Sequence, residues 1–152
     1  MPTTLTRALA DEAATVALGS AIAARLHPGL VVHLRGALGA GKTTLVRALL
    51  RALGERGRVR SPTFSLLETY HAGGFDLAHL DLYRLEQPEE LLHAGLHELL
   101  DGTAVVLIEW PERGAALLPP PDLDVHLAVD GAARTATLTA YGARAGTLLA
   151  AL

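Results

Sequence analysis

The stretch that decides the fold is Gly36-Ala37-Leu38-Gly39-Ala40-Gly41-Lys42-Thr43, which fits the pattern G-x-x-x-x-G-K-[ST] of a phosphate-binding loop. An apolar run at residues 30–34 comes before it and predicts a β-strand, and a helical pattern begins near Thr43. A glycine-rich loop between a strand and a helix is the context in which this motif binds phosphate. The sequence therefore predicts that a nucleotide phosphate binds at this loop.

Each part of the loop has a chemical task. The glycines let the backbone turn tightly and bring its N–H groups close to phosphate oxygens. Lys42 is placed to reach the outer phosphates, and the Thr43 hydroxyl is placed to ligate Mg²⁺. Lys42 is also the only lysine among 13 basic residues, which favours a phosphate loop over an accidental glycine turn. The predicted nucleotide-binding residues here are Gly36, Gly39, Ala40, Gly41, Lys42, Thr43 and Thr44.

Composition limits the other functions that this chain is expected to have. Its 152 residues predict one domain, 1–152, and the absence of cysteine excludes a disulfide framework and a cysteine-ligated zinc site. Without a secretory signal pattern or an uncharged apolar run of about 20 residues, a soluble cytoplasmic protein without a membrane segment is expected. The net charge of −3 and a single arginine cluster at residues 51–60 argue against a protein that clamps nucleic acid alone.

Hydrophobic periodicity and turn residues predict an α/β domain of the P-loop NTPase fold, with a mixed central sheet flanked by helices and with β-hairpins. Two hairpins are expected, around Ala72-Gly73-Gly74 and Asp130-Gly131. A helical segment at 87–100 is expected to break near Gly95. The expected strands are 3–7, 30–35, 64–71, 75–83, 103–108, 123–129 and 134–140, and the expected helices are 10–26, 43–53, 87–100 and 142–152.

Two acidic residues follow strand patterns in positions that suit catalysis. With period two, His79, Asp81 and Tyr83 share one face of the strand at 75–83, although polar residues facing water at a sheet end would give the same pattern. Glu109 ends the continuous apolar run at 103–108, where a magnesium-directing carboxylate belongs beside a phosphate loop. We therefore predict Asp81, Glu109 and Lys42 as catalytic residues, with Thr43 and Glu109 as metal ligands. Trp110, the only tryptophan, is expected to pack close to this site.

A further hydroxyl is predicted in the loop Ser61-Pro62-Thr63-Phe64. The segment after the first helix of a phosphate-loop domain often directs a hydroxyl toward the terminal phosphate and its metal. Thr63 is therefore a candidate nucleotide-binding residue, and a plain loop that enters a strand explains the same spacing equally well.

Four motifs in this order resemble the bacterial TsaE family, also called YjeE. They are GALGAGKTT at 36–44, SPTF at 61–64, HLDLYR at 79–84 and IEWPE at 108–112, and the resemblance covers about residues 10–115. The phosphate loop alone is common to many proteins, whereas the other three motifs in this order are far more specific. Ala37 stands where the family often has aspartate, and the chain beyond residue 115 carries no matching motif.

The resemblance implies a small ATPase that uses ATP and Mg²⁺ in threonylcarbamoyladenosine synthesis, a tRNA modification next to the anticodon. Its implied partner is the TsaB–TsaD complex, with tRNA contacted indirectly or weakly. By the same resemblance Lys42 and Thr43 hold phosphate and magnesium, and Thr63 lies in a switch-like loop. Asp81 and Glu109 serve the metal or the attacking water, and their roles are not divided at this stage.

Two other functions remain open from the sequence. A small-molecule or nucleotide kinase needs an acceptor pocket and usually several arginines in a lid, whereas the arginines beyond residue 61 are few and widely spread. A nucleotide-gated module would control a partner through binding with little turnover. A regulatory GTPase is disfavoured, because its guanine-reading motif requires asparagine and the chain has none.

Overall fold

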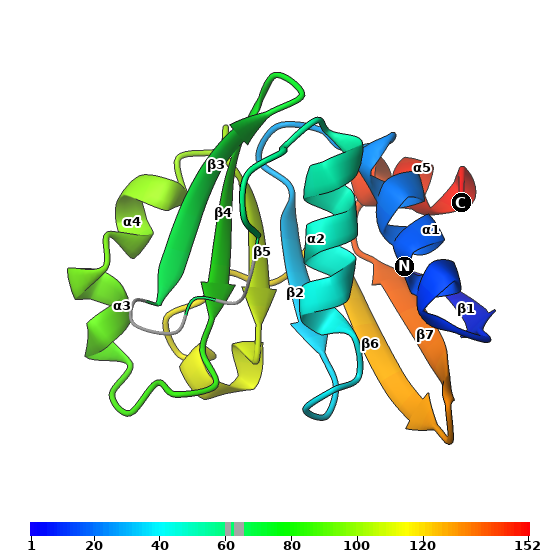
Figure 1. Cartoon of the computed structure of the whole chain (residues 1–152). Coiled ribbons are helices and arrows are strands. Elements are labelled where there is room, and N and C mark those ends of the chain that lie inside the picture. The colour runs from blue at the N-terminus through cyan, green and yellow to red at the C-terminus, as the bar shows by residue number, and fades with distance from the viewer. Residues whose placement is uncertain (60–61, 63–65) are drawn as a thin grey trace.

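The computed structural model describes residues 1–59, 62 and 66–152, and this part of the chain forms one mixed seven-stranded sheet. The strand order is β1-β7-β6-β2-β5-β4-β3 (Figure 1). The four central strands β6, β2, β5 and β4 are parallel, and β3, β7 and β1 pair antiparallel at the edges. The predicted mixed sheet with hairpins is confirmed. The strands are β1 (Thr3–Leu9), β2 (Val31–Arg35), β3 (Leu67–Ala72), β4 (Phe75–Asp81), β5 (Val105–Glu109), β6 (Leu123–Asp130) and β7 (Ala133–Ala140).

Helices cover both faces of this sheet. The elements are α1 (Glu12–Ala23), α2 (Lys42–Ala52), α3 (Glu89–His93), α4 (Leu96–Leu99), the 3₁₀ helix η1 (Pro111–Gly114) and α5 (Ala143–Ala150). The first core cluster joins α1, α2 and α5 to one face, and the second packs α3, α4 and the segment after η1 against the other face at β4 and β5. Figure 1 shows α1 and α2 side by side over the sheet and α3 and α4 near the β3 edge.

Local chemistry explains where the helices begin and end. Asp11 caps α1, since its side chain accepts a hydrogen bond of 2.9 Å from the Ala14 amide. The helix is therefore shorter than the predicted 10–26. At the C-terminal end of α2, Gly54 adopts φ 100° and the Glu55 amide donates to the Leu50 carbonyl at 3.0 Å, as in a Schellman motif. Gly95, with φ 91°, separates α3 from α4, which confirms the predicted break.

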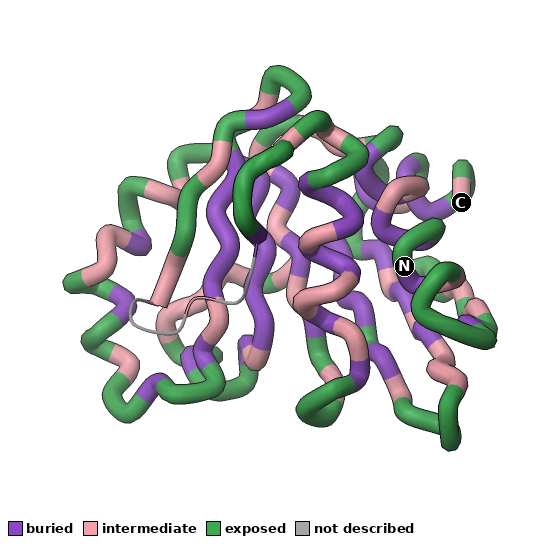
Figure 2. The backbone as a smooth tube through the Cα atoms, in the orientation of Figure 1, coloured by how far each residue is buried: buried purple, intermediate pink, exposed green. Residues whose placement is uncertain are grey.

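Of the two strands that carry the candidate acids, β5 is wholly buried and β4 is buried in its central part. β5 is buried along its whole length, as its apolar sequence predicts, and Figure 2 shows the middle of the sheet as a continuous buried region. In β4, Leu77 belongs to the cluster under α1 and α2, whereas Ala78 and Leu80 belong to the cluster on the other face. His79 is also fully buried, with 0 % of its surface exposed, so the alternative of polar residues facing water is wrong for this position.

The parallel register brings three strand ends to one edge of the sheet. Leu34, just before the end of β2, pairs with Glu109 of β5, and Glu109 pairs with Asp81 of β4. The chain leaves β2 for the glycine loop at this edge and enters α2 at Lys42. Ligand sites of open parallel sheets form at the carboxyl ends of the strands. The topology therefore collects the loop and both acids at one place.

Most strand boundaries differ from prediction by one or two residues; β4, for example, ends at Asp81 and not at residue 83, and β5 is Val105–Glu109 and not 103–108. β1 continues to Leu9 instead of ending at residue 7, because it pairs with β7 along its whole length up to Leu9 opposite Arg134. The strand predicted at 64–71 is described as Leu67–Ala72, since residues 64 and 65 lie outside the described part. Within the described ranges, no helix has the length and apolar character that crossing a membrane requires.

Candidate nucleotide-binding site

The backbone of the loop between β2 and α2 takes conformations that side chains would obstruct. Gly36 has φ 146°, and a Cβ atom placed there would lie 2.4 Å from the Leu127 carbonyl oxygen of β6. Gly41 has φ 108° and opens α2 as its N-cap residue. These positive φ values strongly favour glycine. The loop is thus shaped by its glycines and ends at a helix N-terminus, where backbone N–H groups and the helix dipole favour an anion.

Lys42, the first residue of α2, turns its side chain back into the loop. Its Nζ atom donates to the carbonyl oxygen of Gly36 and, at 3.0 Å, to that of Ala37. Burial lowers the pKa of Lys42 from its usual value, against the opposing charges of Glu109, Asp81 and Glu112. The ammonium group is therefore held by neutral carbonyls in a partly desolvated site. An anion that replaced those carbonyls would bind it more strongly.

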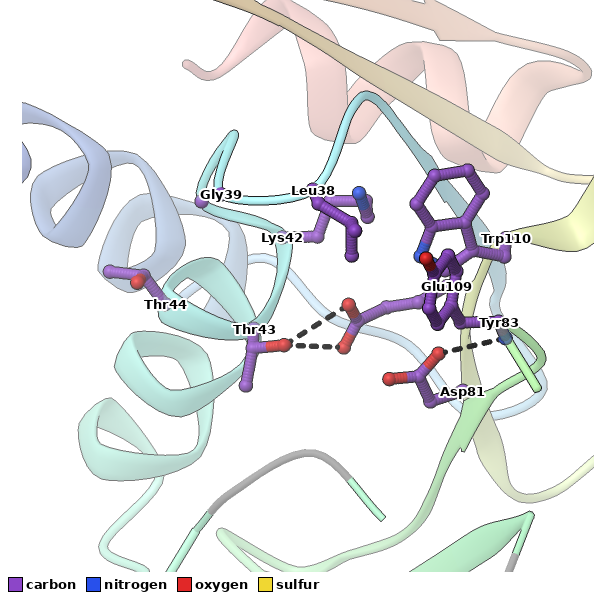
Figure 3. A pocket seen from close by; sticks show the side chains of 10 residues that line it. Leu38, Gly39, Lys42, Thr43, Thr44, Asp81, Tyr83, Glu109 and Trp110 are labelled. Carbon is purple, nitrogen blue, oxygen red and sulfur yellow. Dashed lines mark hydrogen bonds between the residues drawn. The ribbon is translucent and has the colours of Figure 1, made fainter. Parts of the chain in front are cut away.

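Thr43 and Glu109 meet across the site. The Thr43 hydroxyl donates to both carboxylate oxygens of Glu109, at 3.1 Å to Oε1 and 3.0 Å to Oε2 (Figure 3). Glu109 Oε2 also lies 2.5 Å from Nε2 of the buried His79. Only 3 % of the Glu109 side chain is exposed. A hydroxyl and a carboxylate thus face each other at the position where the sequence predicted two metal ligands.

Asp81 lies beside Glu109 at the end of β4. Its Oδ1 atom accepts a hydrogen bond of 3.1 Å from the Tyr83 amide, which fixes the turn that leaves the strand. Asp81 is half-buried, whereas Glu109 is buried. Both carboxylates line the same cavity (Figure 3). The two predicted acids are therefore brought together, but they differ in exposure and in their partners.

Aromatic and cationic side chains form another wall of the site. Trp110 adopts φ 58° and ψ 49°, the left-handed conformation, and no other described residue besides glycines has positive φ. Such strain costs about 1–3 kcal/mol and is concentrated at functional sites. The Trp110 ring centroid lies 4.4 Å from Lys42 Nζ and 5.0 Å from the Tyr83 ring. Arg113 lies 5.3 Å from the Tyr83 ring centroid and 5.9 Å from that of Trp110.

Two cavities adjoin the glycine loop. The first has a volume of about 290 Å³ and is lined by Leu38, Gly39, Gly41, Lys42, Thr43, Thr44, Asp81, Tyr83, Glu109 and Trp110. The second, of about 260 Å³, is lined by Asp11, Glu12, Thr15, Gly39, Ala40, Gly41, Thr44, Ala132 and Arg134. The loop residues Gly39, Gly41 and Thr44 border both. Together the two cavities give room on both sides of the loop for a ligand that extends beyond its phosphate groups.

The predicted site residues that the structure describes lie together. The loop residues Gly39 to Thr44 border these cavities, Gly36 accepts a hydrogen bond from Lys42, and Asp81 and Glu109 stand opposite the loop. Thr63 lies outside the described residues, so its role stays a prediction.

Sequence reasoning missed two contributions to the site. Arg134 of β7 donates to the Gly39 carbonyl at 3.1 Å across a separation of 95 residues. His79 supports Glu109 from a buried position, although only its place in the strand had been noted. The period of two along β4 did place His79 on the face of Asp81, which was the one available signal.

The donor set suits a magnesium-bound nucleotide. Mg²⁺ prefers oxygen ligands and commonly takes one or two from the protein, with phosphate oxygens and water completing its shell. The Thr43 hydroxyl and the Glu109 carboxylate are such ligands and line one cavity with Lys42. Within the described residues, no group of three or more histidine and acidic side chains forms a metal cage. The site is therefore suited to a metal that arrives with a phosphate ligand.

Comparison with known proteins finds relatives that share one name. The family model for "Threonylcarbamoyl adenosine biosynthesis protein TsaE" matches residues 9–136. The tRNA threonylcarbamoyladenosine biosynthesis protein TsaE of Haemophilus influenzae is 41% identical over 128 residues, which cover 81% of each chain. The protein of the same name from Nostoc is 40% identical over 147 residues, covering 93% of this chain and 90% of its own. The crystal structure of Bacillus subtilis YdiB superposes with a TM-score of 0.81 at 30% identity, covering 99% of this chain and 94% of that one.

Proposed function

The chain belongs to the TsaE family, and from this premise we propose that it is a magnesium-dependent ATPase that serves the threonylcarbamoyladenosine modification of tRNA. The proposed partner is the TsaB–TsaD complex. The names of the relatives support the pathway, and the site supports the chemistry. The observation that carries the proposal is the arrangement of Lys42, Thr43 and Glu109 around one cavity at the glycine loop.

Binding of ATP would begin with an exchange of partners at Lys42. In the structure its ammonium group donates to two loop carbonyls. Phosphate oxygens would replace the carbonyls as acceptors and would form charge-assisted hydrogen bonds, which are about twice as strong as neutral ones. The indole of Trp110, 4.4 Å from Nζ, would limit the access of water to this contact.

The two acids are proposed to have different tasks. Glu109 is bonded to Thr43, so these two residues would hold Mg²⁺. When bound, this ion would neutralise charge on the β- and γ-phosphates. Asp81 is the other carboxylate of the same cavity and is more exposed than Glu109, so it is proposed to orient the attacking water. Lys42 would stabilise the charge that develops on the transferred phosphoryl group.

The second cavity is proposed to receive the nucleoside part of ATP. It shares Gly39, Gly41 and Thr44 with the first cavity. The nucleoside of a ligand whose phosphates bind the loop could therefore enter the second cavity. Asp11, the N-cap of α1, and Arg134 of β7 line this cavity. Their polar side chains suit the hydroxyl and amino groups of a nucleoside. ATP would then lie across the loop.

Turnover by the isolated protein is proposed to be slow. Lys42 lines the first cavity, whereas Arg113 lies beside the Tyr83 and Trp110 rings and is not among the residues that line it. In related chemistry, an arginine supplied by a partner raises the rate by about a thousandfold or more. A partner that inserts a cation would therefore accelerate hydrolysis. The net charge of −3 also supports weak direct binding of tRNA.

The proposed function is tested by steady-state ATP hydrolysis in the presence of Mg²⁺, with purified TsaB and TsaD titrated from zero to excess. We expect a rate that rises with the partners, release of inorganic phosphate, and loss of activity in the Lys42→Ala variant. Transfer of phosphate to an added nucleoside would support the kinase alternative. A rate that stays flat while association is measured independently would contradict activation by the partners and would favour a binding module with little turnover.

A further inference from the structure

His79 lies beside the Glu109 carboxylate, on the strand next to it in the sheet. It belongs to β4, and only 1 % of its side chain is exposed. Its Nε2 atom is 2.5 Å from Glu109 Oε2, and it is absent from the residues that line either cavity at the loop. A histidine in this position cannot touch a ligand in the cavity. Its effect on the site must pass through Glu109.

The hydrogen bonding of His79 defines which atom carries the proton. Its Nδ1 atom is buried and has no hydrogen-bond partner in the described part of the chain. An ionised carboxylate only accepts hydrogen bonds, so Nε2 must carry the hydrogen in the bond to Glu109. The Nε2 hydrogen is therefore directed at Glu109 Oε2.

This bond makes the two oxygens of Glu109 different. Oε2 is held from within the sheet by His79, while the Thr43 hydroxyl bridges Oε1 and Oε2 from the cavity side. If the Thr43 oxygen turns toward a cation, its bonds to Glu109 are released, whereas the bond from His79 can remain. Glu109 Oε1 is then the oxygen left for the cavity. Such outer hydrogen bonds orient ligating carboxylates and increase metal affinity.

We propose that His79 is a positioning residue: it fixes the Glu109 carboxylate so that Oε1 is presented to the magnesium of bound ATP. This inference rests on the proposed function, because it assigns a support to a ligand that the proposed function requires. The contribution of His79 is a single hydrogen-bond donor at the Nε2 position. Its removal would weaken the binding of Mg²⁺–ATP and would leave the contacts of Lys42 with phosphate intact.

The test compares His79→Leu, His79→Gln and His79→Asn with the wild-type protein. The amide nitrogen of glutamine reaches about the same place as histidine Nε2, whereas that of asparagine matches Nδ1. The Kd of ATP is measured by the fluorescence of Trp110, the only tryptophan, first with Mg²⁺ and then with EDTA. Trp110 is a suitable reporter because its ring lies 4.4 Å from Lys42 Nζ.

We expect the Kd with Mg²⁺ to rise by about 10–100-fold in His79→Leu and His79→Asn, the range typical for loss of such a support. His79→Gln should stay close to the wild type, and the Kd in EDTA should be the same for all four proteins. Equal affinities with Mg²⁺ in every variant would overturn the proposal. So would equal losses with Mg²⁺ and EDTA, which would indicate a general structural role.

The glutamine and asparagine variants keep the test decisive if His79→Leu does not fold, since the proposal requires them to differ. Equal behaviour of these two variants would overturn it. The measurements on the wild-type protein distinguish a failure of this inference from a failure of the proposed function. If the ATP affinity of the wild-type protein does not depend on Mg²⁺, both the proposed function and the role of His79 are contradicted. If the wild type shows this dependence and the variants bind like it, only the role of His79 is contradicted.

Discussion

At the scale of single residues, Glu109 differs most from what its position in the sequence indicates. An acid at a strand end is expected to be removable without a core cavity, but Glu109 is 2 % exposed and bonded to Thr43 and His79. Removing its side chain would leave the buried His79 ring and the half-buried Thr43 hydroxyl without this partner. This cost is about 1–3 kcal/mol when a buried donor is left unsatisfied. Asp81 is half-buried, so water can replace part of the hydrogen bonding that its removal would cost.

We predict that Glu109→Ala abolishes magnesium-dependent hydrolysis and also lowers the free energy of unfolding by about 1–3 kcal/mol. Asp81→Ala should impair hydrolysis with a smaller loss of stability. Urea unfolding and ATP hydrolysis, each measured on both variants, check this. Glu109→Gln is the matched control, because it keeps the shape and most hydrogen bonds but removes the charge. A Glu109→Ala protein that hydrolyses ATP normally in its folded fraction would make this residue structural.

At the scale of elements, the close crossing of α1 and α2 holds the loop in place. A Cβ atom added at Gly19 of α1 would lie 2.8 Å from the Ala48 Cβ atom and 2.8 Å from the Leu45 carbonyl oxygen of α2. These neighbours are a backbone atom and a Cβ atom bonded to the backbone, so they can move away only if the helix itself shifts. Since α2 begins at Lys42, such a shift would also move the site.

Gly19→Ala is therefore predicted to destabilise the protein by about 1–3 kcal/mol, the usual range for overpacking. The matched control is Gly146→Ala in α5, where an added Cβ atom meets nothing within 4 Å. This control should stabilise the protein by about 0.5–1 kcal/mol, because alanine is the better helix former. Urea denaturation of the two variants gives both values. If Gly19→Ala were as stable as Gly146→Ala, the close packing of α1 on α2 would be refuted.

The elements that could be predicted are those whose sequence signals lie close together in the chain. The loop, α2, β5 and both hairpins were predicted because motif, periodicity and turn residues lie within a few positions of each other. The extent of β1 could not be predicted, because it depends on pairing with β7, more than 120 residues away. The roles of Arg134 and His79 were missed for the same reason, since each acts on a residue that the fold alone brings near.

At the scale of the whole molecule, a half-buried histidine on the sheet makes stability depend on pH. Burial lowers the pKa of His33 in β2, although Asp124 and a hydrogen bond with the Pro119 backbone act in the opposite direction. Its Nε2 atom is buried without a partner in the described part of the chain. The unfolded chain has the ordinary pKa of about 6.5, so below that pH it binds a proton that the folded state does not.

The stability contributed by neutral His33 is therefore present above pH 6.5 or so and is lost as the pH falls toward the lowered pKa of the folded state. We predict that His33→Asn reduces the loss of unfolding free energy between pH 7.5 and pH 5.5 or so, relative to the wild type. Urea denaturation at the two pH values measures it. His126→Asn, at an exposed position of the neighbouring β6, is the control and should keep the wild-type slope. Equal slopes for all three proteins would contradict this.

The central claim is that the loop at 36–43 binds Mg²⁺–ATP through Lys42, and calorimetric titration tests it most directly. The wild-type protein is compared with Lys42→Ala, and Arg25→Ala, which removes an exposed charge outside both cavities, serves as the control. One charge-assisted hydrogen bond contributes about 1.5–3 kcal/mol, so the affinity of Lys42→Ala should be about 10–100-fold weaker. Arg25→Ala should bind like the wild type. An unchanged affinity in a folded Lys42→Ala protein, or no binding by the wild type, would contradict the account.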